Sequence, residues 1–368
     1  MNILSDYWHT LQVSLFPFME IVVEVPLTDK LKQLIAILDV ICIENHVERH
    51  YQSGRGRKAY DRRSIARTFI AKAVLNVPQT KIIREMLLSE NTLRTICGFK
   101  NSQSVPSESV FSRSFYSLAK SDLGDRVHQF LVKTYVGDKI VMHLCRDSTE
   151  IIAREKPVYT PKQKNFETSK RHRGRPKKSE ELSCKKPSWL IKQIDQTPEE
   201  ALSELSNVCS VGSKLDSKGR MHSWNGYKAH IDWMDGGIPL TVVTTSASVH
   251  DSQVAIPMAR LSARKVTSLY DLMDSAYDAQ AIRSVSQSLG HVAIIDVNKR
   301  NKADAVPMEP CRAERYKERS TAERGNSRLK DEFGFRFVRV RGHSKVHLHL
   351  MFGILALFAD QLIRIFAG

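Results

Sequence analysis

The sequence lacks the patterns that mark secreted, zinc-stabilised and membrane-spanning proteins. Its six cysteines are scattered and form no Cys-x-x-Cys pair, which argues against a structural zinc site and against a disulfide framework. The apolar run Leu350–Ala359 stops at Asp360, at about half of the ~20 residues that a membrane span needs. The apolar stretch from Val13 to Leu27 contains two glutamates and has no positive leader, so no signal peptide is expected. We therefore expect a cytoplasmic protein with no membrane partner.

The chain is also short of acidic residues. It has 40 Asp and Glu residues against 56 Lys and Arg residues, which gives a formal charge of +16 and a pI near 9.6. An excess of positive charge of this size draws a protein to polyanions, and nucleic acid is the most plausible of these for a soluble chain. The apolar content of 42% is that of a globular protein, and 368 residues are enough for two or three domains.

Residues 1–135 have the periodicity of short helices in tandem. Asp61 precedes an apolar-periodic stretch that ends before Pro78, and three more helical segments follow up to residue 119. Basic residues lie between and along these segments, namely Lys81, Arg84, Arg94 and Arg113. Two readings stay open: a DNA-binding domain of the helix-turn-helix kind, or a helical packing domain whose basic residues are merely solvated.

Residues 136–368 have the pattern of an α/β domain with a mixed sheet. Strand signals at 140–145, 225–232 and 238–245 suggest antiparallel strands, and later strands alternate with helices. Between these groups lies a basic, flexible insertion that we place at 154–222. Its first part, 154–187, has twelve Lys and Arg residues against four Asp and Glu residues, and little apolar content.

The insertion contains the segment Arg173-Gly-Arg175-Pro-Lys177-Lys178. This segment resembles the AT-hook, in which glycine lets the backbone approach the floor of the minor groove while flanking arginines enter its negative potential. The resemblance makes these four basic residues candidate DNA contacts. A non-specific basic tether explains the same residues equally well.

Three acidic residues have positions that suggest catalysis. Asp147 and Asp274 follow predicted strands, and strand ends in α/β sheets are where sites assemble. Glu323 lies in a polar helical stretch. Carboxylates brought together repel one another unless a cation neutralises them, and hard oxygen ligands suit Mg²⁺ or Mn²⁺. Taken singly, each aspartate is more often a turn or capping residue.

The stretch Tyr316–Lys330 is almost wholly polar. If it were one helix, Tyr316, Arg319, Glu323 and Lys330 would share one face, which suits a surface that grips phosphate and holds a cation. The competing interpretation is that Ser320-x-x-Glu323 is only a helix capping box.

Together these motifs resemble the DDE transposases of bacterial insertion sequences. The matching residues are Asp147-Ser-Thr, Trp224-Asn-Gly-Tyr-Lys-Ala-His230, His250-Asp-Ser252, Asp274-Ser-Ala-Tyr277 and the ungapped series Tyr316-x2-Arg319-x3-Glu323-x6-Lys330. That last spacing is the signature of one branch of these enzymes. The resemblance covers the chain from about residue 62 to its C-terminus.

The resemblance implies an RNase H-like fold with Asp147, Asp274 and Glu323 as catalytic, metal-binding residues, holding two Mg²⁺ ions that Mn²⁺ can replace. It implies that Tyr316, Arg319 and Lys330 contact DNA phosphates. The implied activity is cleavage at the terminal inverted repeats of an element and transfer of the 3′-hydroxyl end into target DNA. The implied setting is a homodimer on double-stranded DNA in the bacterial cytosol.

Several alternatives remain open at this point. Asp251 and Asp278 are nearby carboxylates that can also serve as ligands, and His222, His230 and His250 can lie near the site. In place of a transposase, the chain can be a catalytically retired DNA-binding protein of transposase origin. It can also be an RNase H-like nuclease that cuts without joining.

Overall fold

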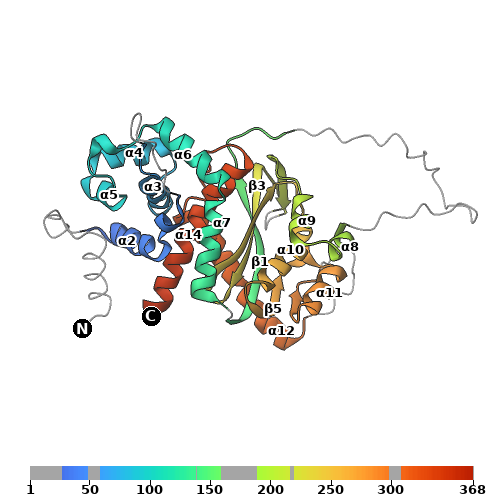
Figure 1. Cartoon of the computed structure of the whole chain (residues 1–368). Coiled ribbons are helices and arrows are strands. Elements are labelled where there is room, and N and C mark those ends of the chain that lie inside the picture. Colours follow the sequence, from blue (N-terminus) through green and yellow to red (C-terminus); the bar gives the residue numbers. More distant parts are fainter. Residues whose placement is uncertain are drawn as a thin grey trace, which may run out of the picture.

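The computed structural model describes residues 27–48, 59–137, 139–158, 189–215, 219–297 and 308–367. Figure 1 shows a helical part and a sheet-containing part, with one long helix between them. The residues of the AT-hook-like segment, Arg173, Arg175, Lys177 and Lys178, lie outside the described residues.

The N-terminal part is helical, as its periodicity predicts. Its helices are α2 (Asp29–Ile41), α3 (Arg62–Val74), α4 (Thr80–Ser89), α5 (Asn91–Ile96), α6 (Glu108–Lys120) and α7 (Leu123–Leu131). Asp61 begins α3 as its N-cap, because its carboxylate accepts hydrogen bonds from the amides of Arg63 and Ser64. Short 3₁₀ turns at Ile43–His46 and Ser102–Ser104 connect helices, and a π-helical turn, Val132–Val136, leads from α7 to the sheet.

Within the described residues the sheet has six strands, which run in mixed directions. They are β1 (Ile140–Ile152), β2 (Ser210–Leu215), β3 (Met221–Met234), β4 (Ile238–Ser246), β5 (Thr267–Met273) and β6 (Val292–Ile295). β3 pairs antiparallel with β1, β2 and β4, whereas β5 pairs parallel with both β1 and β6. The strand order is β2-β3-β1-β5-β6, and β4 pairs with β3 off this path, so an antiparallel part around β3 adjoins the parallel strands β1, β5 and β6. This confirms the predicted α/β fold with an RNase H-like mixed sheet.

A glycine allows the central strands to cross closely. Gly226 lies where β3 meets the end of β1, at a φ of 152°, and a Cβ there would be only 2.0 Å from the carbonyl oxygen of Ile151. The Trp-Asn-Gly-Tyr motif of the sequence thus has a structural use, because only glycine leaves room for this approach.

The remaining helices cover the sheet and the helical part. They are α8 (Trp189–Ile194), α9 (Pro198–Ser203), α10 (Ser252–Ala263), α11 (Gln280–Ser288), α12 (Pro310–Tyr316), α13 (Ser320–Glu332) and α14 (His343–Ala367), with 3₁₀ turns at Asp235–Gly237, Ser275–Tyr277 and Lys317–Arg319. The predicted insertion at 154–222 is therefore regular in part, since it contains α8, α9 and β2. Gln193 of α8 and Arg260 of α10 tie these elements to the domain through hydrogen bonds.

Helix α14 joins the two parts of the molecule. It contacts α2, α3, α6 and α7 on one side and β4 and α13 on the other. It is long and apolar enough to cross a membrane by length and composition, but most of its apolar stretch is buried inside the protein, as expected for a helix that is hydrophobic all round. One continuous hydrophobic core consequently includes Phe69 of α3, Leu144 of β1 and Phe358 of α14.

Candidate active site

Asp147 and Asp274 become neighbours through parallel strand pairing. In the register of β1 and β5, Arg146 pairs with Met273, so the next residue of each strand is one of the two aspartates. Asp274 directly follows β5, as predicted, and its carboxylate accepts a hydrogen bond from the amide of Ala276 at 2.9 Å. The prediction that Asp147 follows a strand end is wrong, because β1 continues to Ile152 and Asp147 lies within it.

The strand continues past its apolar run because its polar residues are buried with partners. Arg146 is almost wholly enclosed, and its guanidinium donates two hydrogen bonds of 2.8 Å to the Asp232 carboxylate on β3. Asp147 on the next position then points to the opposite face of the sheet.

Glu323 comes to these aspartates from α13, and Arg319 lies among all three. The Arg319 guanidinium is 2.9 Å from Glu323 Oε1, 3.4 Å from Asp147 Oδ1 and 3.8 Å from Asp274 Oδ2. We call Asp147, Asp274 and Glu323 the carboxylate cluster. One guanidinium thus holds together acidic residues that are far apart in the sequence.

The backbone here is not a single helix. Tyr316 ends α12, Lys317–Arg319 form a 3₁₀ turn, and α13 begins at Ser320. The N-cap of α13 is Arg319, with no side-chain capping hydrogen bond, so the capping-box interpretation of Ser320 and Glu323 is wrong. The Glu323 side chain is instead exposed and free to serve the cluster.

Asn326 is a further member of this site that the sequence reasoning missed. Its amide nitrogen donates a 2.9 Å hydrogen bond to Asp147 Oδ2, and the residue is buried. It lies three residues after Glu323, a spacing that places both side chains on the same face of α13. This three-residue spacing is the feature of the sequence from which Asn326 could have been predicted as a site residue.

The carboxylate cluster contains three acidic side chains and only one basic side chain, Arg319. The pKa of Asp147 is raised to about 6, mainly by burial and to a smaller extent by the nearby Asp274, against the opposing effect of Arg319. Burial likewise raises the pKa of Asp274. Burial opposes the charge of Arg319, but Asp147, Asp274 and Glu323 outweigh it and raise the pKa of the guanidinium.

The other signature residues lie at different distances from the cluster. Tyr316 is half-buried, and burial raises its pKa to about 12, with smaller contributions from Asp274 and Glu323. Lys330 is two turns further along α13 and contacts Glu150 at 3.4 Å instead of the cluster. His222 is 3.4 Å from the same Glu150.

The carboxylates weighed as alternatives have ion-pair partners of their own, although Asp251 is near enough to Asp147 and Asp274 to raise the pKa of both. Asp251 accepts a 2.9 Å hydrogen bond from Lys228, and His230 lies 3.8 Å away. Asp278 forms a 3.0 Å ion pair with Arg283. His250 bonds to Ser252 at 2.8 Å.

The donors of the carboxylate cluster fit a divalent cation by their chemistry. Three carboxylates share one positive group, Arg319, and burial raises the pKa of Asp147, so a bound cation would favour the charged form of this carboxylate. No group of three or more His, Cys, Asp or Glu side chains in the described part of the chain is arranged to hold a metal ion. In this arrangement the Arg319 guanidinium contacts all three carboxylates of the cluster.

Comparison with known protein families gives two matches, both to transposase domains. A model described as a transposase DDE domain matches residues 197–359, which include Asp274 and Glu323, and a transposase domain model (DUF772) matches residues 20–116. No curated protein and no solved structure is similar enough to the chain to add to these two matches. Transposases of this kind depend on a divalent metal, bind DNA, cut it and transfer its strands. The two matched domains are typical of the DDE transposases of bacterial insertion sequences and indicate that the chain is a DNA transposase.

Proposed function

We propose that Asp147, Asp274 and Glu323 are the catalytic residues of this transposase and hold two Mg²⁺ ions, which Mn²⁺ can replace. The single observation that carries this proposal is the convergence of the three carboxylates on Arg319. When bound, such ions activate the attacking oxygen and stabilise the leaving oxygen at phosphorus. Asn326 orients the Asp147 carboxylate by its hydrogen bond.

Arg319 has two successive roles in this proposal. Without metal, its guanidinium neutralises the cluster and keeps the carboxylates close together. With metal and DNA present, the same guanidinium turns to a phosphate beside the scissile bond, for which its fork of donors is suited. Tyr316 and Lys330 contact further phosphates, and Lys330 leaves Glu150 to do so.

The reaction on DNA has two steps at phosphorus. Water first displaces the 3′ oxygen at the element end and leaves a 3′-hydroxyl. That hydroxyl then attacks a target phosphodiester, so that a new bond forms at phosphorus as the target's own 3′ oxygen leaves. Residues of the carboxylate cluster position the reacting groups in both steps.

The rest of the chain supplies DNA binding and assembly. We assign DNA binding to the helical residues 1–135 and the catalytic domain to 136–368, with the insertion at 154–222. Arg173, Arg175, Lys177 and Lys178 contact the minor groove in this proposal. The active complex is a homodimer in the bacterial cytosol, because two element ends must be brought together.

The test uses the purified protein and a labelled duplex made from the inverted repeats that flank the coding region. With Mg²⁺ or Mn²⁺ we expect nicking at the repeat boundary, and a pre-cut end should join to added plasmid. Cutting without joining would instead identify a nuclease. Binding without cutting under either metal would identify a retired DNA-binding protein, and each of these two results would contradict the proposal.

A further inference from the structure

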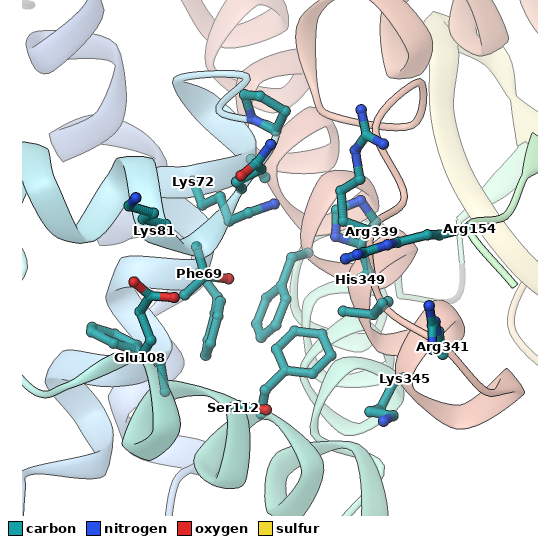
Figure 2. A pocket seen from close by; sticks show the side chains of 18 residues that line it. Phe69, Lys72, Lys81, Glu108, Ser112, Arg154, Arg339, Arg341, Lys345 and His349 are labelled. Atoms are coloured by element: carbon teal, nitrogen blue, oxygen red, sulfur yellow. The ribbon is translucent and has the colours of Figure 1, made fainter.

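A second charged site lies between the helical part and the segment that leads into α14. It is a cavity of about 700 Å³, lined on one side by residues of α3, α4 and α6 and on the other by residues 339–352 and Arg154. Figure 2 shows these side chains facing one another across the opening. We call this cavity the basic groove.

The charge of the basic groove is strongly one-sided. It is lined by a single glutamate, Glu108, and by six Lys and Arg residues, which are Lys72, Lys81, Arg154, Arg339, Arg341 and Lys345. Lys81 has a carboxylate partner, Glu85, at 3.8 Å across the surface of α4. Within the described residues the other five form no ion pair. A cavity in which basic side chains greatly outnumber acidic ones favours an anionic ligand.

Lys72 is the most enclosed cation of the basic groove. It is 8% exposed, it lines the cavity, and its ammonium group extends from α3 toward the C-terminal segment in Figure 2. Within the described part of the chain it has no hydrogen-bond or ion-pair partner. Most of the side chain is enclosed, and burial lowers the pKa of its ammonium group to about 8 because the charged form is less well solvated there. An anion in the groove would favour that charged form.

Backbone amides add to this preference. Gln79 and Thr80, at the start of α4, line the groove, and the N-cap Gln79 makes no side-chain capping hydrogen bond. Glu108 opens α6 at the same cavity, where the N-cap Ser107 also makes none. Helix N-termini with uncapped amides attract phosphate.

The basic groove and the carboxylate cluster are connected by β1 and the residues that follow it. Arg154 follows Asp147 by seven residues of β1 and its extension, or roughly 20 Å of extended chain. A DNA duplex covers that distance in about six base pairs, at 3.4 Å for each. Lys330 and Lys214 meet Glu150 between the two sites, so further positive charge borders the route.

We propose that the basic groove binds the phosphodiester backbone of the DNA duplex whose cleavage site lies in the carboxylate cluster, about half a helical turn away. The inference rests on the transposase activity and adds a place where the DNA is held. Because phosphates carry no base identity, the groove sets the register and orientation of the duplex without reading its sequence.

The test measures binding in a chelator, so that its outcome does not depend on cutting. A fluorescein-labelled 40-base-pair duplex of mixed sequence is titrated at several salt concentrations with wild type and with the double variant Arg339→Ala/Arg341→Ala. Both arginines are exposed, so the fold should persist, which circular dichroism checks. The matched control is Lys139→Ala/Arg264→Ala, which removes two exposed cations outside the groove, outside residues 1–135 and outside the insertion at 154–222.

We expect the groove variant to bind about tenfold more weakly at low salt, with a salt slope smaller by about two, and the control to bind like wild type. Lys72→Met keeps the buried stem without the charge, and should weaken binding several-fold and reduce the slope by about one. Equal affinities and slopes in the groove and control variants would overturn the inference. Loss of cutting in Glu323→Gln with the groove effect absent would separate that failure from the catalytic proposal.

Discussion

The carboxylate cluster and the basic groove have opposite excesses of charge. In the cluster, three acids surround a single guanidinium, and burial raises the pKa of Asp147 to about 6. In the groove, six cations surround one acid, and burial lowers the pKa of Lys72 to about 8. Each site bears a charge that the described chain leaves uncompensated.

The difference indicates two different ligands on one surface. The excess of acid calls for metal cations, and the excess of base calls for phosphate. A folded protein gains nothing in stability from either excess, because each buried charge costs desolvation energy. We conclude that both sites are kept for binding DNA and acting on it.

The largest effect should come from removing one acid of the cluster. Asp274→Asn keeps the shape of the side chain and its place after β5 but removes a metal ligand, so DNA cutting should fall by at least about a hundredfold. The measurement is the rate of nicking with Mn²⁺ on the flanking-repeat duplex. Asp278→Asn is the control, because Asp278 is paired with Arg283 and should not be required. Equal losses of cutting in both variants would contradict the assignment of Asp274 as a metal ligand.

The excess negative charge of the carboxylate cluster should lower the stability of the folded protein when no metal is bound. Asp147 has a folded pKa of about 6, above its ordinary 3.8, so the folded protein retains a proton that the unfolded chain releases between these pH values. Stability without metal should therefore decrease as pH rises from about 4 to about 6 and remain lower above it.

In EDTA, Asp147→Asn should therefore be more stable than wild type at pH 7.5, by up to about 3 kcal/mol, and the gain should shrink at pH 5. Urea unfolding at both pH values measures this. The exposed Asp195→Asn is the control and should show neither effect. A variant less stable than wild type at pH 7.5 would show that Asp147 is a stabilising ion-pair partner instead.

The position of α13 should matter next. A Cβ on Gly325 would lie 2.5 Å from the ring of Trp233, so Gly325→Ala should force the helix away from β3 and destabilise the fold by about 1–3 kcal/mol. Because α13 carries Glu323 and Asn326, cutting should fall while binding in the basic groove stays. Thermal unfolding and the two DNA assays check this. Unchanged cutting would mean that the cluster tolerates a shifted helix.

The smallest effect should come from Ser320→Ala. Ser320 does not cap α13, because Arg319 is the N-cap and no side-chain capping bond is made. The free energy of unfolding should change by less than about 0.5 kcal/mol. A loss near 1 kcal/mol, typical of a capping residue, would restore the capping-box interpretation.

Much of the fold could be predicted because local patterns agree with it. The helices around Ile65, Ile83 and Leu118 follow their apolar periodicity, and β5 ends before Asp274 as its sequence suggests. β1 was predicted too short, since its second half is polar. This polar half of β1 is paired with β3, and the Arg146–Asp232 hydrogen bond joins the two strands between residues 86 positions apart, which a local sequence pattern does not reveal.

The candidate site could be predicted in its residues but not in its arrangement. The spacing of Arg319 and Glu323 is local, yet the contact of Arg319 with Asp147 spans 172 positions and depends on the break between α12 and α13. The basic groove could not be predicted, because its lining comes from α3, α4 and α6 and from residues more than 200 positions later, which are brought together by the packing of α14 against α3 and α6.

The most direct test compares Glu323→Gln with Glu318→Gln under Mn²⁺ on the flanking-repeat duplex. Both substitutions remove one exposed negative charge, but only Glu323 contacts Arg319 beside the two aspartates. We predict that nicking at the repeat boundary is lost in Glu323→Gln and retained in Glu318→Gln, with DNA binding equal in both. Full nicking by Glu323→Gln would contradict the assignment of the carboxylate cluster as the catalytic centre.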